Sequence, residues 1–235
     1  MTRKKPKKES FTREFTPPKA KTRNQADLLD IFTKFDGMNE RMVLLTGPAG
    51  TGKTYLTAAY AGYLLKHKII DKIVITRPNV PTGATIGLLP GTMEEKMTPW
   101  VKSFLEPLGQ YLGPKDVDCI KGKTLEVVPL EVIRGRTFDN CVIVLDEAQN
   151  TTKEEIKAFV TRQGKNTLCV LNGDITQSDI MHKDKSGLKY LLHLFNKNKS
   201  LQNYVDMVEF TTDDIVRSGI TKEWVLAFDK DERLT

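Results

Sequence analysis

The stretch Gly47-Pro48-Ala49-Gly50-Thr51-Gly52-Lys53-Thr54 decides the fold of this chain. It fits the pattern GxxxxGK[ST] without a mismatch, follows a strand-like apolar run at residues 42–46, and opens a helical stretch at residues 53–67. Glycines let such a loop fold so that its backbone N–H groups converge on phosphate oxygens. The helix that follows points its positive N-terminal end at the same place. Strand, loop and helix in this order predict a phosphate-binding P-loop rather than a chance glycine-rich turn.

The last two residues of this loop carry the chemistry that a nucleoside triphosphate needs. The ammonium of Lys53 can reach the β- and γ-phosphates, and the hydroxyl of Thr54 can serve as a ligand of Mg²⁺. ATP and Mg²⁺ are therefore the expected cofactors. The residues expected to bind the nucleotide are Gly47, Pro48, Ala49, Gly50, Thr51, Gly52, Lys53, Thr54 and Tyr55.

A second acidic site follows the apolar run at residues 141–145, where Asp146 and Glu147 stand side by side. In open α/β sheets, ligands bind at the carboxyl ends of the strands. We expect Asp146 to hold Mg²⁺ and Glu147 to orient and deprotonate the attacking water. Taken alone, the two acids could be a solvated strand end, but the P-loop makes the catalytic interpretation the stronger one.

A third apolar run, residues 168–171, precedes Asp174 and Gln177. Its end should lie beside the other two strand ends. The amide of Gln177 can both donate and accept a hydrogen bond, so it could contact the γ-phosphate or the attacking water. Asp174 could steady the ligand shell of the magnesium ion. A plain Gly-Asp turn is the alternative.

The rest of the chain alternates short apolar runs with longer helical stretches. Strand-like runs cover residues 42–46, 73–76, 125–128, 141–145, 168–171 and 205–210. Helical stretches cover residues 53–67, 93–112, 153–162 and 187–196. This alternation predicts an α/β fold with a doubly wound, mostly parallel sheet. No repeat or linker divides the chain, so we expect a single domain over residues 24–235.

The basic excess lies at one end of the chain. The formal net charge is +6, and residues 1–23 hold nine basic side chains against two acidic ones. We predict a flexible tail there, which either binds a polyanion or only aids solubility; an import address is a third interpretation.

Composition also indicates the compartment. No apolar run approaches the roughly 20 residues that a bilayer requires, and no apolar segment follows the basic start as in a secretory signal. Cys119, Cys141 and Cys169 lack metal-ligand spacing and are odd in number, which predicts reduced thiols in the core. We expect a cytoplasmic protein that does not contact a membrane.

Taken together, the motifs are similar to the ATPase core of superfamily 1 helicases and resemble the PhoH family more closely. The resemblance extends from about residue 24 to about residue 229, and it implies one RecA-like core that binds ATP and Mg²⁺. The combination of ITRP, RGRT and DEAQNTT is specific to the family. The matching segments are TGPAGTGKT (46–54), ITRP (75–78), GLLPG (87–91), EEKMTPW (94–100), RGRT (134–137), LDEAQNTT (145–152), GDITQSD (173–179) and SGL (186–188).

The resemblance implies roles for three further residues. Gln25 matches a glutamine that lies upstream of the P-loop and contacts adenine. Arg217 matches an arginine among the last of the helicase-like motifs, which senses the γ-phosphate or acts as an arginine finger. Arg77 matches a helicase position associated with nucleic acid, and a surface salt bridge is the alternative. Departures from the family's common residues bear on fine specificity, and they fall at Leu88, Asn172, Ser218 and Gly219.

One P-loop and one acidic pair indicate one core, whereas superfamily 1 helicases bind ATP between two. A lone core lacks the arginine finger of a neighbouring core, which raises the rate of hydrolysis by about 10³–10⁵. We therefore expect a homo-oligomer, with a hexameric ring favoured, in which Arg134, Arg136 or Arg217 reaches across the interface.

Two functions of different classes remain. The first is an ATPase that couples hydrolysis to binding, remodelling or unwinding of RNA or single-stranded DNA, as the motif order and the basic tail suggest. The second is a nucleotide-gated regulatory ATPase that acts through protein partners, because the nearly neutral remainder of the chain shows no evident basic groove or aromatic series.

Overall fold

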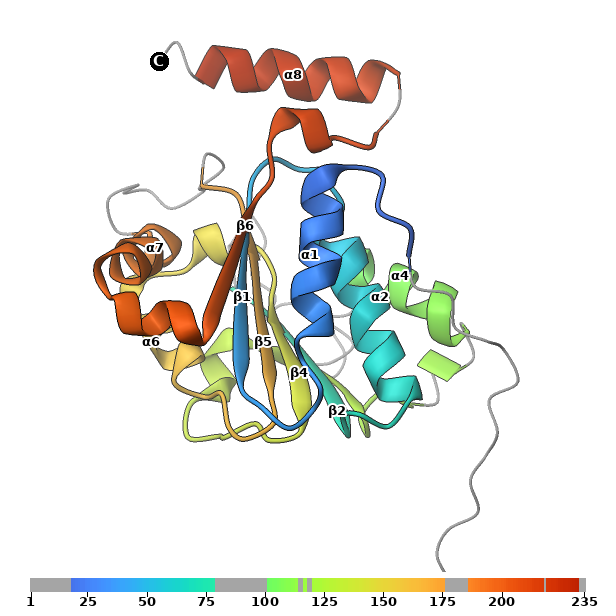
Figure 1. Cartoon of the computed structure of the whole chain (residues 1–235), viewed down its shortest axis with the longest axis vertical. Coiled ribbons are helices and arrows are strands. Elements are labelled where there is room, and N and C mark those ends of the chain that lie inside the picture. Colours follow the sequence, from blue (N-terminus) through green and yellow to red (C-terminus); the bar gives the residue numbers. More distant parts are fainter. Residues whose placement is uncertain are drawn as a thin grey trace, which may run out of the picture.

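A sheet of six parallel strands forms the centre of the computed structural model (Figure 1). The structure describes residues 18–78, 101–113, 116–117, 120–175, 186–217 and 219–232. The strand order is β3-β2-β4-β5-β1-β6, and each strand lies on one of the predicted runs, which confirms the α/β fold. The strands are β1 (Arg41–Thr46), β2 (Lys72–Arg77), β3 (Leu125–Pro129), β4 (Cys141–Leu145), β5 (Leu168–Gly173) and β6 (Val205–Glu209).

Helices cover both faces of this sheet. In Figure 1, α1, α2 and α4 lie on one face, α6 and α7 on the other, and α8 beyond the upper ends of the strands. These helices are α1 (Arg23–Thr33), α2 (Lys53–Lys66), α4 (Lys102–Leu112), α6 (Lys153–Val160), α7 (Gly187–Lys197) and α8 (Ile220–Glu232). Short 3-10 turns, η3 (Leu130–Ile133), η4 (Ala148–Asn150), η6 (Lys199–Asn203) and η7 (Thr212–Asp214), complete the described connections. Among the described residues, no helix combines the length and the apolar composition that a membrane span requires.

Alternation along the central strands divides the core into two layers. Val43 and Leu45 of β1 pack with Phe32 of α1 in one apolar cluster, while Leu44 packs with Phe159 of α6 in the other. This is the period of two that a strand imposes on its side chains. Cys141 and Cys169 are buried free thiols, as expected, whereas Cys119 lies outside the described residues.

Two helices were missed by the sequence analysis, α1 and α8. Helix α1 begins at Arg23, and the hydroxyl of Thr22 caps it by accepting the N–H of Gln25 at 3.3 Å. Pro18 is also buried. The predicted boundary between tail and domain at residues 23 and 24 therefore falls inside structured chain. Basic and proline-rich composition concealed this start, because a single capping threonine gives little signal against it.

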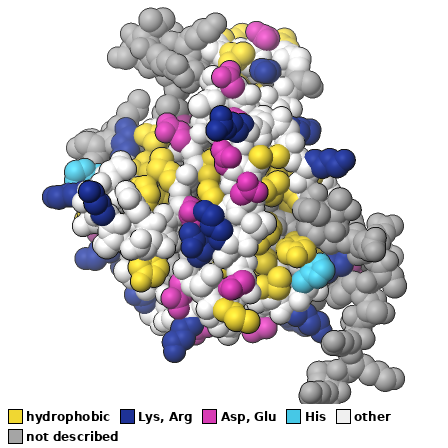
Figure 2. Space-filling view, in the orientation of Figure 1, with side chains coloured by type: hydrophobic (Ala, Val, Ile, Leu, Met, Phe, Trp, Pro, Cys, Tyr) yellow, Lys and Arg dark blue, Asp and Glu magenta, His cyan; other side chains and the backbone are white. Residues whose placement is uncertain are grey.

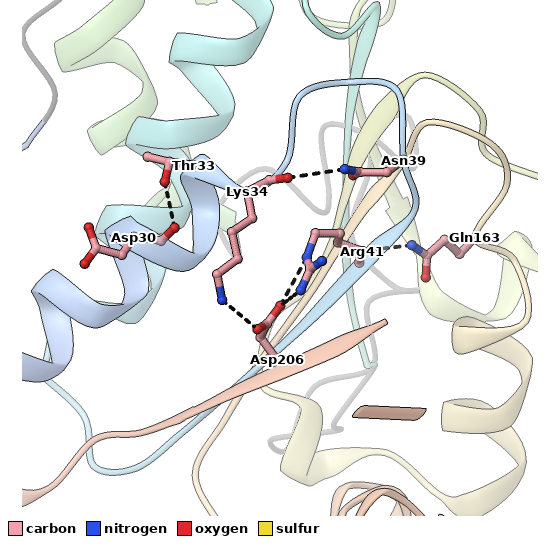
Figure 3. A network of polar contacts seen from close by, with 7 residues as sticks. All are labelled: Asp30, Thr33, Lys34, Asn39, Arg41, Gln163 and Asp206. Atoms are coloured by element: carbon pink, nitrogen blue, oxygen red, sulfur yellow. Dashed lines mark hydrogen bonds and ion pairs between the residues drawn. The ribbon is translucent and has the colours of Figure 1, made fainter. Parts of the chain in front are cut away.

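The edge strand β6 is attached through the carboxylate of Asp206 (Figure 3). Arg41 of β1 donates to this carboxylate from both Nε and Nη2, and Lys34 after α1 lies 3.3 Å from its Oδ1. Gln163 in turn donates to the backbone carbonyl of Arg41 at 2.9 Å. One carboxylate thus joins two strands and a helix end.

We expect Asp206→Ala to lower the free energy of unfolding by about 2 kcal/mol, because it leaves the guanidinium of Arg41 partly buried without its carboxylate partner. Glu106→Ala is the matched control: its carboxylate pairs with Lys102 at 3.4 Å on an exposed helix face. That change should cost no more than about 0.5 kcal/mol. Urea denaturation measures both, and equal effects would contradict the role of Asp206.

Candidate nucleotide-binding site

A cavity of about 640 Å³ opens where the carboxyl ends of β1, β5 and β4 lie side by side. Strand β5 stands between the other two, so the P-loop after β1 and the acids after β4 flank the end of β5. Residues from all three strand ends line the cavity, as the sequence predicts. This is the edge at which open α/β sheets bind ligands.

The P-loop follows β1 in a conformation that its glycines make accessible. Gly47 has φ +122°, and a Cβ there would lie only 2.1 Å from the carbonyl oxygen of Phe210. Gly52 has φ +91° and stands at the N-terminus of α2. Ala49 to Thr54 and Tyr55 line the cavity. The loop therefore presents its backbone and the N-terminus of α2 to the same space.

Lys53 lies folded over the loop. Its Nζ donates to the carbonyl oxygens of Gly47 at 2.5 Å and Pro48 at 2.8 Å. Burial lowers the pKa of Lys53, and the negative charges of Asp174, Asp146 and Glu147 oppose that effect. A phosphate oxygen would compete with the two carbonyls for the ammonium and would favour its charged form.

The two halves of the site meet at Asp146. Thr54 Oγ1 donates to Asp146 Oδ1 at 3.2 Å, and Asn172 Nδ2 donates to the same oxygen at 3.3 Å. Burial raises the pKa of Asp146, Glu147 adds to the increase, and Arg77, Asn172 and Thr54 oppose it. A cation beside this carboxylate would therefore relieve the cost of its burial.

The donor set at this point fits Mg²⁺. A hydroxyl and a carboxylate are oxygen ligands, and magnesium binds proteins through one or two carboxylates while substrate phosphates and water supply the rest. Asn172 adds an amide oxygen nearby, since its Oδ1 is buried without a hydrogen-bond partner among the described residues.

Glu147 follows Asp146 in a left-handed backbone conformation, with φ 56° and ψ 42°. Its Oε1 lies 3.6 Å from Arg77 Nη2, and its Oε2 accepts a hydrogen bond from Gln149 Nε2 at 2.6 Å. Gln149 also accepts the N–H of Asp174 at 3.1 Å. Sequence reasoning missed Gln149, although the letters DEAQ place an amide two residues after the acid.

Gln25 and Arg217 both line the cavity. Gln25 donates to the carbonyl of Thr51 at 2.9 Å and accepts the N–H of Lys21 at 2.8 Å, so it also supports the P-loop. Arg217 stands over Gly50 of its own chain, where a Cβ would lie 3.0 Å from the Arg217 Nε. Asp174 lines the cavity as expected, while Gln177 lies outside the described residues.

Arg134 and Arg136 are not among the residues that line this cavity. Arg136 donates to Glu126 at 2.5 Å and stacks over the ring of Phe138 at 4.6 Å. Glu126 also pairs with Lys72, the first residue of β2, so this cluster lies at the opposite end of the strands from the cavity. Arg134 is exposed.

The chain matches one protein family over most of its length. The family described as "PhoH-like protein" matches residues 18–229. Protein PhoH of Escherichia coli (strain K12) is 38% identical over 194 residues, which are 81% of this chain and 53% of the relative. A PhoH-like protein of Bacillus subtilis (strain 168) is 37% identical over 190 residues, with 80% and 58% covered. The chain thus spans a little over half the length of these curated relatives.

Solved structures show weaker likeness. The DnaC helicase loader aligns with a TM-score of 0.41 and 12% identity, over 82% of this chain and 93% of that one. The Pif1 helicase of Candida albicans aligns with a TM-score of 0.39 and 14% identity, and the alignment covers 81% of this chain and 39% of that one. At these scores the alignments add nothing to the fold described above.

Gly47→Ala should lower the free energy of unfolding by about 3 kcal/mol or more, because the new methyl group meets the carbonyl of Phe210. Gly135→Ala is the matched control: Gly135 also has positive φ, +77°, but nothing lies within 4 Å of a Cβ there. Backbone strain alone should cost it about 1 kcal/mol. Thermal unfolding compares the two, and equal losses would mean that close packing at Gly47 is unimportant.

Proposed function

This chain belongs to the PhoH family, and from that premise we propose that it hydrolyses ATP and couples hydrolysis to the binding or remodelling of RNA or single-stranded DNA. Its family and its P-loop fold are those of an ATPase-type enzyme. The observation that carries the proposal is the 3.2 Å contact between Thr54 and Asp146, since it brings the P-loop and the acidic strand end to one point.

The geometry of the described residues supports the roles that we propose for them. The loop N–H groups and Lys53 bind the phosphates, and Thr54 and Asp146 hold Mg²⁺, which would offset the negative charge on the phosphate oxygens. Glu147 removes a proton from the attacking water. Gln25 and Tyr55 belong to the nucleotide site, and Gln177 is proposed to contact the γ-phosphate or the water.

Arg217 stands over its own P-loop, which favours a sensor of the γ-phosphate in the same subunit. If a neighbouring subunit supplies a finger, Arg134 is the better candidate, because it is exposed whereas Arg136 is paired with Glu126. We retain a hexameric ring, a single domain and a cytoplasmic location as proposals.

A second candidate function is a nucleotide-gated regulatory ATPase that acts through protein partners. The distribution of charge in Figure 2 favours this second function, because acidic and basic side chains of the described residues are interspersed on the face shown. Polynucleotide binding without sequence preference usually uses a continuous basic surface.

ATP turnover of the purified chain, with and without RNA, single-stranded DNA and duplex DNA, tests the proposal. We expect slow turnover alone and faster turnover with RNA or single-stranded DNA. Turnover that no polynucleotide changes would leave the regulatory function, and no turnover under any condition would contradict both.

Lys53→Ala should weaken ATP binding at least about tenfold and lower turnover by about 10³ or more, because the phosphates lose their nearest fixed cation. Binding of a fluorescent ATP analogue and phosphate release measure the two effects. Lys66→Ala, at the other end of α2, is the matched control and should change neither. Normal turnover in Lys53→Ala would contradict the assignment of this site.

Glu147→Gln keeps the size of the side chain but removes the base. We expect ATP to bind within about threefold of the normal affinity while turnover falls by about 10²–10⁴. Single-turnover phosphate release separates the chemical step from binding. Full turnover in this variant would remove Glu147 from the mechanism.

A further inference from the structure

An ion pair joins Arg77 to Glu147, the side chain to which the proposed function assigns the proton of the attacking water. Arg77 Nη2 lies 3.6 Å from Glu147 Oε1, and Gln149 Nε2 donates to Oε2 at 2.6 Å. Each oxygen of the carboxylate thus faces a cationic or hydrogen-bond-donating group. A carboxylate held in this way is not free to turn toward a water molecule, because both of its oxygens are engaged.

The pairing follows from the register of two neighbouring strands. Thr76 of β2 lies opposite Leu145 of β4, and the N–H of Asp146 donates to the carbonyl of Thr76 at 3.0 Å. Arg77 and Glu147 therefore leave the sheet next to each other. The left-handed backbone of Glu147, at φ 56°, is uncommon for a residue with a side chain and is typical of functional sites.

We infer that Arg77 is a positioning residue that restrains Glu147, and that a phosphate of a bound single-stranded polynucleotide competes for its guanidinium and releases the carboxylate. The inference rests on the proposed function and deepens it, since it names how polymer binding would reach the hydrolytic step. A free polynucleotide site would then correspond to slow hydrolysis, and an occupied one to fast hydrolysis.

The chemistry of the pair suits such an exchange. The side chains of Arg77 and Glu147 are 30% and 37% exposed, and 3.6 Å is longer than a hydrogen bond. Ion pairs at this exposure are weak, so a new anion can replace one partner. A guanidinium binds phosphate oxygens through two parallel hydrogen bonds, which a single carboxylate oxygen at this distance does not match.

Gln149 is held in place more firmly than Arg77. It is 3% exposed, and its side chain also accepts the N–H of Asp174 at the end of β5. This second contact keeps its amide in place when Arg77 moves. Gln149 would then orient the released carboxylate while Arg77 determines whether it is released.

Arg77→Gln tests the inference through the steady-state kinetics of ATP hydrolysis with and without poly(U) RNA. We expect kcat without RNA to rise about fivefold, the scale of a weak ion pair, while KM for ATP stays within about twofold. Added poly(U) should give little further increase. If Arg77 only supported the fold, Arg77→Gln would lower kcat or raise KM instead.

Lys72→Gln is the matched control. It removes one positive charge from the same strand, and the partner of Lys72, Glu126, keeps its contact with Arg136. Its kcat and its response to poly(U) should equal those of the unaltered protein. Arg77→Lys, which keeps the charge, should have a kcat without RNA closer to that of the unaltered protein than Arg77→Gln has.

Three results would overturn the inference. An Arg77→Gln protein with unchanged kcat and lost stimulation would make Arg77 a polymer contact that does not restrain Glu147. A lower kcat, with ATP-analogue affinity unchanged, would make it a supporting residue. An increase in kcat with full stimulation by poly(U) would show that the polymer does not act through Arg77. Failure of the proposed function is distinguishable, since the unaltered protein would then either not hydrolyse ATP or hydrolyse it at a rate that poly(U) does not change.

Discussion

The parallel alignment of β1, β5 and β4 is the constraint on which the site depends. A parallel sheet places the carboxyl ends of its strands at one edge, so residues far apart in sequence meet there without any long side chain having to reach. Thr54 and Asp146 are 92 positions apart and lie in hydrogen-bond contact. The tight loop at Gly47, held against Phe210 after β6, then turns the N-terminus of α2 toward that edge.

The buried charges at this edge of the sheet favour the binding of phosphates and a divalent cation. A half-buried lysine and a buried aspartate are both costly, because burial lowers the pKa of Lys53 and raises the pKa of Asp146, so that the neutral form of each is favoured. Phosphates beside Lys53 and a divalent cation beside Asp146 would relieve both costs at once. Glu147 adds its negative charge to this balance, but its side chain is more exposed, and Arg77 and Gln149 hold it. We therefore expect nucleotide binding and hydrolysis to be separable by substitution at Glu147.

Much of this could be predicted from sequence because it is local or periodic. The glycine spacing, the apolar runs and the acids after residue 145 predict the strands and the meeting of the P-loop with Asp146. What the sequence did not give depends on partners in space. The pairing of Arg136, a candidate for a neighbour's site, with Glu126 is one such contact. The contact of Arg77 with Glu147 arises from strand register, which a run of letters does not give. Helix α1 was concealed by basic composition before its cap.

The central claim is that the P-loop and Asp146 hold a single metal–nucleotide complex. Electron paramagnetic resonance of Mn²⁺, titrated into the chain with a non-hydrolysable ATP analogue, tests it most directly. We predict one tightly bound Mn²⁺ per chain when the analogue is present, weak binding without it, and loss of the tight site in Asp146→Asn. Tight Mn²⁺ binding that persists in that variant, or an analogue that does not bind the unaltered chain, would contradict the account.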